Sequence, residues 1–240
     1  MQNRWFVIAV LLAWSAPAHA GRSFFGWLYS TEVMSERRVE LQTWVFEEDG
    51  KVGNTKQTSL WSAPLVGITD QLELALPIEM SSTGADMEAQ TFALQRVGIE
   101  ARYRLVPAEV NEEPVFVPLI RVAAKRDVIV RNDVRLEADL VGSYESGAVQ
   151  VLADAGFTAD LTPSNQHVEV HPGAGISVRV AEQLRLGAEA YAEFSFDGES
   201  WAVVGPDLSW THHRFWVTGT FGIGVYQAQV APRVMWGLAF

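Results

Sequence analysis

Charged side chains at every second position are the feature of this sequence with the most chemical content. His167, Glu169 and His171 follow this spacing. In an extended strand all three side chains point to one face, but two histidines four residues apart are separated by about 13 Å of strand rise. They therefore cannot share a metal ion without ligands from neighbouring strands. A polar hydrogen-bond network is the favoured interpretation, and we predict neither a metal site nor a cofactor.

A serine nucleophile needs a nearby histidine base and an orienting carboxylate or amide. Ser177 would share a strand face with His171, yet six residues of strand separate them by about 20 Å, and no G-x-S-x-G elbow occurs. The glycine-rich run GTFGIGVY (219–226) precedes no helix, which argues against a phosphate loop. We therefore predict that the chain is not an enzyme and keep a lipid-modifying enzyme only as an alternative.

The remaining candidate site consists of opposite charges on the polar faces of neighbouring segments. Such charges either line a pore and set its selectivity, or they pair across strands and close a narrow lumen; the sequence leaves both interpretations open. The charges on 96–104 are expected to face those on 121–139, and a second group is expected on 179–193. The candidate lumen residues are Arg96, Glu100, Arg102, Arg104, Arg121, Arg135, Glu137, Asp139, Asp154, His167, Glu169, His171, Arg179, Arg185, Glu189, Glu193, Asp207 and Arg233.

The elements that must position these charges are β-strands. In LELALPIEM (72–80), a large apolar residue occupies every second position, and RVGIEARYRL (96–105) alternates in the same way. A period of two is the strand period, and a helix cannot segregate these residues. Twelve such segments follow one another, each about the 9 to 11 residues of a tilted membrane-spanning strand. We predict an all-β, antiparallel up-and-down transmembrane barrel of about 12 strands, with ten as the alternative count.

A soluble β-sandwich in the periplasm also alternates and is the competing fold. Aromatic residues at segment ends favour the barrel, because aromatic girdles mark the two interfaces of a membrane. Since lipid cannot satisfy backbone hydrogen bonds, strands in a membrane must close. The residues expected in the girdles are Phe196, Trp201, Trp210, Phe215, Trp236 and Phe240.

The N-terminus predicts export. Residues 1–20 combine Arg4, a short apolar run and a small-residue A-x-A ending, the layout of a cleaved signal peptide. We expect residues 21–36 to form an N-terminal periplasmic segment and 37–240 to form the barrel. The net charge of −11 and the lack of a basic cluster argue against nucleic acid as a partner. The absence of cysteine excludes disulfides and thiolate sites.

Link lengths predict the orientation of the barrel. Short links at 67–71, 144–147, 181–183 and 211–214 alternate with longer polar links at 47–57, 81–90, 124–133 and 162–167. Short periplasmic turns and longer outer loops are typical of outer-membrane barrels, so both termini are expected in the periplasm. The link 107–114 departs from this pattern, because it is long where a short turn is expected.

The final strand resembles the C-terminal signal by which the barrel-assembly machinery recognises its clients, with Val234, Trp236, Leu238 and Phe240 on one face. Three stretches resemble poorly characterised proteobacterial barrels related to the family annotated for the meta-pathway of phenol degradation. They are FGWLYSTEVMSERRVELQTWVFEEDGK (25–51), LVGITDQLELALPIEM (65–80) and VGIEARYRL (97–105). The resemblance implies a barrel in the outer membrane of a Gram-negative bacterium, in contact with lipid. It also suggests a passive channel or binding barrel for small solutes, hydrophobic or aromatic ones among them; a structural or adhesive barrel is the alternative.

Overall fold

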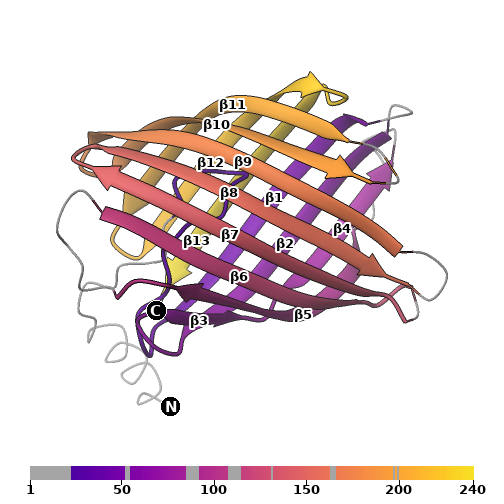
Figure 1. The fold of residues 1–240 in the computed structure, drawn as a ribbon, viewed down its shortest axis with the longest axis horizontal. Helices are drawn as coiled ribbons and strands as arrows, with labels where there is room; N and C mark the ends of the chain where they lie inside the picture. Colours follow the sequence, from indigo (N-terminus) through magenta and orange to yellow (C-terminus); the bar gives the residue numbers. More distant parts are fainter. Residues whose placement is uncertain are drawn as a thin grey trace, which may run out of the picture.

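The sheet closes on itself into a barrel, because β1 (Val39–Lys51) pairs with both β2 (Thr55–Gly67) and β13 (Val230–Ala239) (Figure 1). The structure is a computed structural model and describes residues 23–51, 55–84, 92–107, 115–130, 132–162, 166–196, 198 and 200–240. The expected signal peptide lies outside the described residues. Every strand pairing among them is antiparallel. If β3 (Leu72–Ala75) and β4 (Ile78–Gly84) are counted as one strand, each pairing except the closing one joins neighbours along the chain.

The barrel has the twelve strands that the alternation predicts. One of them is interrupted: β3 and β4 both lie between β2 and β5, and Leu76 and Pro77 separate them. Proline lacks the N–H that a continuous ladder requires. The described strands are β1 (Val39–Lys51), β2 (Thr55–Gly67), β3 (Leu72–Ala75), β4 (Ile78–Gly84), β5 (Ala93–Arg104), β6 (Val115–Asp127), β7 (Val134–Ser146), β8 (Val149–Leu161), β9 (Gln166–Ala181), β10 (Leu184–Ser195), β11 (Trp201–His212), β12 (Phe215–Tyr226) and β13 (Val230–Ala239).

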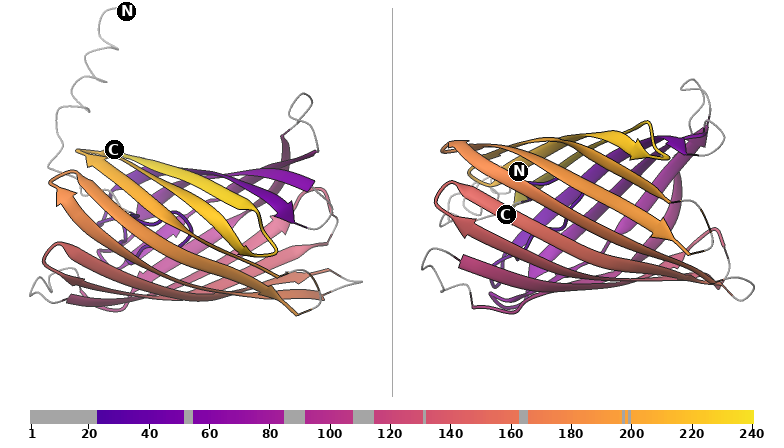
Figure 2. Two further views of the ribbon diagram at one scale, coloured as in Figure 1. Left: turned by 90° about the horizontal axis from the view of Figure 1, so that it is seen from above. Right: turned by 45° about the horizontal axis from the view of Figure 1, so that its top comes forward.

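The two ends of the barrel differ in their connections. Turns of two residues at 147–148, 182–183 and 213–214 lie at the end that holds the C-terminus, labelled C in Figure 2. We call this the short-turn end; it is the end expected to face the periplasm. At the opposite end the strands run further than predicted, because β1 continues to Lys51 and β2 begins at Thr55. The predicted loops 81–90 and 107–114 lie largely outside the described residues.

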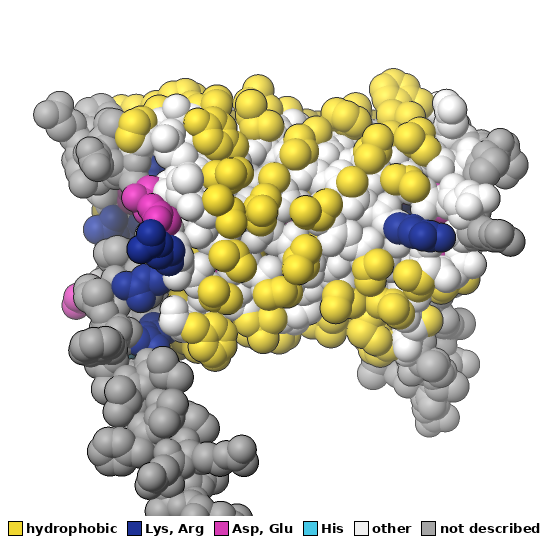
Figure 3. Space-filling model, turned by 90° about the horizontal axis from the view of Figure 1, so that it is seen from below, with side chains coloured by type: hydrophobic (Ala, Val, Ile, Leu, Met, Phe, Trp, Pro, Cys, Tyr) yellow, Lys and Arg dark blue, Asp and Glu magenta, His cyan; other side chains and the backbone are white. Residues whose placement is uncertain are grey.

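The outer wall is apolar. Figure 3 shows hydrophobic side chains spread over the middle of the barrel, with the charged side chains of that face near its two ends. Val234 and Leu238 of β13, and Phe240 directly after it, are 41 to 56% exposed on this outer surface, and Trp236 shares the face of Val234 and Leu238. An apolar band between polar ends is the surface that a bilayer solvates. No helix among the described residues is long and apolar enough to cross a membrane.

One girdle residue is placed on the opposite face from the predicted one. Trp201 was expected to face lipid, but it is 1% exposed and points into the barrel. Its neighbour Ala202 and the next alternate residue, Val204, take the outer positions of β11, so strand alternation turns Trp201 inward. There its ring centroid lies 5.3 Å from that of Trp27 and 5.5 Å from that of Tyr191.

Candidate functional site

The N-terminal segment lies inside the barrel. Residues 23–34, which we call the inserted segment, enter the lumen from the short-turn end and return to it before β1 begins (Figures 1 and 2). Phe25, Leu28 and Met34 are almost completely buried. This position differs from the periplasmic placement expected for 21–36. The reason is that the barrel interior offers apolar contacts and hydrogen-bond acceptors that a free segment would lack.

The wall is shaped to receive the inserted segment. On β9, a Cβ atom added to Gly175 would lie 2.5 Å from the Phe25 ring, and one added to Gly173 would lie 2.2 Å from a methyl group of Leu28. Any side chain larger than hydrogen at these two positions would collide with the segment. The glycines therefore permit the close approach of segment and wall.

Carboxylates on the wall hold the backbone of the inserted segment. Glu189 Oε1 accepts hydrogen bonds from the backbone N–H groups of Gly26 at 3.0 Å and Trp27 at 2.9 Å. Asp154 accepts from the N–H of Tyr29 at 3.1 Å, and Glu73 accepts from that of Met34 at 2.7 Å. The contacts come from three separate parts of the wall, so the segment is fastened on several sides.

We predict that Glu189→Ala loosens the inserted segment. The substitution leaves the Gly26 and Trp27 N–H groups without their acceptor, a loss of about 1 to 3 kcal/mol for buried donors. Amide hydrogen exchange measured on the folded protein in micelles should accelerate at these two residues by about tenfold or more. Glu79→Ala is the matched control, because Glu79 contacts Lys125 and Arg96 on the wall. Unchanged exchange in Glu189→Ala would contradict the fastening role.

Part of the predicted charge group forms a buried network centred on Arg121. This side chain is 1% exposed and reaches three carboxylates, those of Glu100 at 2.7 Å and of Glu137 and Asp139 at 2.6 Å each. The guanidinium carbon also lies 4.1 Å from the ring centroid of Tyr29 in the inserted segment. Strands β5, β6 and β7 are thus tied to one another and to the inserted segment through one arginine.

Neighbouring charges extend this network along the same wall. Arg102 pairs with Glu73 at 3.2 Å and with Glu100 at 2.7 Å, although the backbone register sets it opposite Arg121. Lys125 Nζ lies 2.5 Å from Glu79 and 2.6 Å from Glu137. Opposite charges therefore neutralise one another over most of this side of the lumen.

The second predicted group is divided rather than joined. Arg179 and Arg185 both bind Glu145, at 3.1 and 3.3 Å, near the short-turn end. Glu189 instead holds the inserted segment, and Glu193 accepts a hydrogen bond from the Trp201 indole at 3.0 Å. Strand alternation predicts that these residues face inward, but their distances along the barrel separate them.

The remaining predicted residues also face inward but take separate positions. Arg104 alternates with Arg102 at the short-turn end, Asp207 receives a hydrogen bond from Thr220, and Arg135 forms a two-nitrogen pair with Asp160. Arg96 approaches Glu79 at 3.6 Å and Asp127 at 3.9 Å.

The histidines and the serine do not form a joint site. His167 Nε2 lies 2.7 Å from Glu169, whereas His171 approaches Thr158 at 3.3 Å and Asp139 at 3.4 Å. Ser177 accepts a hydrogen bond from Arg185 at 3.0 Å. Among the described residues, no group of three or more histidine, aspartate or glutamate side chains is arranged to hold a metal ion.

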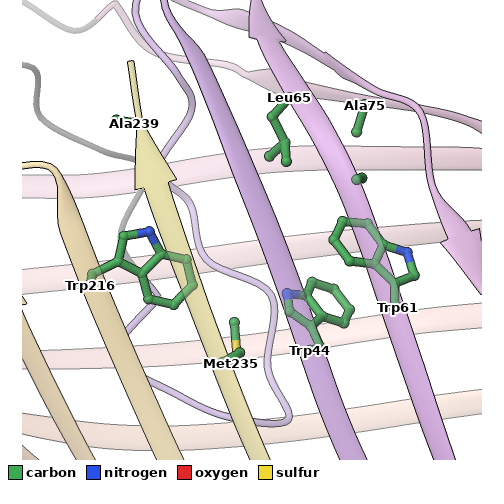
Figure 4. Packing of buried hydrophobic residues seen from close by; sticks show 8 residues of the cluster. Trp44, Trp61, Leu65, Ala75, Trp216, Met235 and Ala239 are labelled. Atoms are coloured by element: carbon green, nitrogen blue, oxygen red, sulfur yellow. The ribbon is translucent and has the colours of Figure 1, made fainter. Parts of the chain in front are cut away.

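A cavity of about 420 Å³ lies beyond the inserted segment, in the half of the lumen away from the short-turn end. Trp27 and Tyr29 of the inserted segment line it, together with side chains from much of the wall. One side is aromatic, because Trp44 and Trp61 stack there with ring centroids 4.3 Å apart (Figure 4). The other side is charged, with the network around Lys125 and Glu137. Prediction from sequence missed the aromatic side.

The sequence contained a signal for this aromatic side. Trp44 and Phe46 occupy the positions of β1 that alternate with the outward Val45, and Trp61 occupies the corresponding face of β2. Such a pattern places aromatic residues on the inner face of a strand. Alternation is less regular in these two strands than in 72–80 or 96–105, because polar and apolar residues are mixed on both of their faces.

Comparisons with known proteins support the fold. The sequence matches no family model and no curated protein. The crystal structure of the COG4313 outer membrane channel from Pseudomonas putida F1 is similar, with a TM-score of 0.67 and 10% identity over 89% of this chain and 99% of that one. The translocator domain of the autotransporter NalP from Neisseria meningitidis has a TM-score of 0.54 and 11% identity over 99% and 94%. The NanC porin has a TM-score of 0.54 and 8% identity over 82% and 98%.

One prediction needs correction, namely that the chain is not an enzyme. The matching structures are not confined to channels, because they include the translocator domain of the autotransporter NalP. Identities near 10% establish the fold alone, and one fold hosts many functions. The exclusion of enzymes was therefore wrong, and it is withdrawn.

Together, the closed twelve-strand sheet, the apolar outer wall and these similar structures assign the chain the fold of an outer membrane β-barrel. None of the comparisons supports the narrower resemblance to the phenol meta-pathway family.

Proposed function

We propose that the protein is a channel barrel of the Gram-negative outer membrane, through which small solutes pass or in which they bind. The observation that carries the proposal is the cavity of about 420 Å³ inside a closed, lipid-compatible wall. A volume of this order is within the range of pockets for small molecules, about 300 to 1,000 Å³. The similarity to an outer membrane channel and a porin adds to this support at the level of the fold.

The inserted segment is the barrier on the proposed route. It is held by hydrogen bonds to wall carboxylates and by contacts with side chains, but no disulfide fastens it, since the chain contains no cysteine. A solute in the cavity reaches the short-turn end only when this segment shifts. The proposed channel is therefore closed in the conformation described and opens through displacement of residues 23–34.

The same proposal includes location and biogenesis. Lipid contacts the outer wall, and the barrel-assembly machinery recognises β13, whose outward residues include Val234, Leu238 and Phe240. Export follows from the expected signal peptide. The short turns at one end of the barrel support a periplasmic location for the short-turn end.

The wild-type protein provides the first test. Refolded protein in planar bilayers should give low mean conductance interrupted by brief openings, because the lumen is blocked for most of the time. A heat-modifiable gel shift establishes that the preparation is folded. Folded protein that gives neither openings in bilayers nor flux of small sugars into liposomes would refute the channel.

A permanently closed structural barrel is the second candidate, and the network around Arg121 favours it. That network joins three strands and the inserted segment through contacts of 2.6 to 2.7 Å with three buried carboxylates. Such a barrel would give no openings under any condition that leaves it folded. The conductance measurement therefore separates the two candidates.

A further inference from the structure

We infer that the cavity beyond the inserted segment binds a small anion with a flat apolar body, of the class of the aromatic carboxylates, and that Arg233 receives the anionic group. This inference rests on the proposed function, because it names the class of solute that the channel would take. Three observations carry it: an unpaired buried cation, the neutralisation of the other cations around the cavity, and aromatic rings beside that unpaired cation.

Arg233 is a buried guanidinium without a direct ion pair among the described residues; the carboxylates of Glu189 and Glu48 act on it electrostatically without contacting it as an ion pair. Its side chain is 8% exposed and lines the cavity, and its Nε is enclosed without a hydrogen-bond acceptor. In the described part of the chain, it forms no ion pair and no hydrogen bond. A buried charge without a counter-charge is costly, so an anion that reached this guanidinium would relieve that cost.

Aromatic rings hold the guanidinium in place. Its central carbon lies 4.4 Å from the ring centroid of Trp44, 5.0 Å from that of Trp27 and 5.2 Å from that of Phe46. Cation–π contacts of this kind fix the orientation of the planar group. They supply no acceptor for its N–H donors, and a planar fork of donors is the geometry that matches a carboxylate.

The other cations that line the cavity already have partners. Lys125 lies between Glu79 and Glu137, at 2.5 and 2.6 Å. Arg96 approaches Glu79 at 3.6 Å, and Arg135 binds Asp160 through two nitrogens. Among the described residues, Arg233 is therefore the lysine or arginine of the cavity lining that has no direct ion pair.

The surroundings of Arg233 also suit a flat apolar body. Trp44 and Trp61 stack on one side, and Trp27 stacks on Tyr191 with ring centroids 5.2 Å apart. All four rings line the cavity, whose volume of about 420 Å³ fits a ligand of one or two rings. A ring bound there would contact apolar faces while its carboxylate reached the guanidinium.

The test is ligand binding to the folded full-length protein in detergent micelles, measured by saturation-transfer NMR and calorimetry. Three probes separate the contributions: benzoate, the neutral and nearly isosteric benzamide, and acetate, which has the charge without the ring. Benzoate should bind, and benzamide and acetate should each bind at least about tenfold more weakly. Empty micelles correct for partitioning.

Substitutions then test the assignment of Arg233. Arg233→Gln should weaken benzoate binding by about tenfold or more while leaving the weak binding of benzamide unchanged. Arg135→Gln is the matched control, because Arg135 lines the same cavity but is already paired, and it should bind benzoate as the wild type does. If Arg233→Gln lacks the heat-modifiable gel shift, Arg233→Lys replaces it; the charge remains, the planar fork is lost, and binding should weaken severalfold.

Equal binding of benzoate and benzamide by the wild type would overturn the inference, as would wild-type affinity for benzoate in folded Arg233→Gln or Arg233→Lys. Binding in micelles does not depend on conductance. Benzoate binding without channel openings would therefore reject the channel and keep the anion site. Channel openings without benzoate binding would keep the channel and reject the anion site.

Discussion

Deletion of residues 23–34 should raise the conductance of the barrel by on the order of tenfold, because it removes the only described segment that crosses the lumen. Phe25, Leu28 and Met34 occupy space that water and ions would then fill. The wall keeps its closing pair of β1 and β13, so the barrel itself should survive. Single-channel recordings in planar bilayers measure the change, and a heat-modifiable gel shift confirms folding.

A disulfide that fastens the segment is the converse of the deletion. The side-chain oxygens of Thr31 and Ser143 lie 2.6 Å apart, one on the inserted segment and one on β7. Because the natural chain has no cysteine, Thr31→Cys with Ser143→Cys introduces a single possible bridge. The oxidised double variant should lose its openings, and reduction should restore them.

The deletion has an outcome that would contradict it. A deletion variant that is folded and conducts no better than the wild type would show that residues 23–34 are not the barrier.

Replacement of Arg121 by methionine should destabilise the protein by about 3 to 5 kcal/mol, the cost of breaking a buried charge network from one side. Glu100, Glu137 and Asp139 would lose their shared cation while remaining buried close to one another. The stacking contact with Tyr29 would also be lost. Urea titration, followed by the gel shift between folded and unfolded protein, measures the difference.

Arg135→Met is the matched control for Arg121→Met. Arg135 also binds a carboxylate, that of Asp160, but its side chain is 23% exposed and has one acidic partner. The loss should therefore be about 1 kcal/mol or less, as is usual for partly exposed pairs. Similar losses in the two variants would mean that the network around Arg121 contributes no more than an ordinary surface pair.

The number of strands is a feature of the fold that local alternation in the sequence predicts. Alternation in segments such as 72–80 and 96–105 depends on neighbours in the chain, and it predicted the twelve strands, their antiparallel order and the inward face of the charges. Where a local irregularity intervened, at Pro77, the strand still kept its place between β2 and β5. The predicted lipid-side position of Trp201 was wrong, because alternation along β11 turns this residue inward although it lies at the end of the strand.

The class of the fold follows from local sequence pattern, since the period of two and the lack of a long apolar stretch after residue 20 are properties of neighbouring residues. The contents of the lumen depend instead on contacts between residues far apart in the chain. Trp27 meets Glu189 across 162 positions of sequence, and Arg233 meets Trp27 and Trp44 from the last strand. Contacts of this kind depend on closure of the barrel and on the depth of each residue along it, and neither quantity is encoded in a local period. The inserted segment, the neutralised charges and the unpaired arginine therefore emerge together, when the sheet closes around residues 23–34.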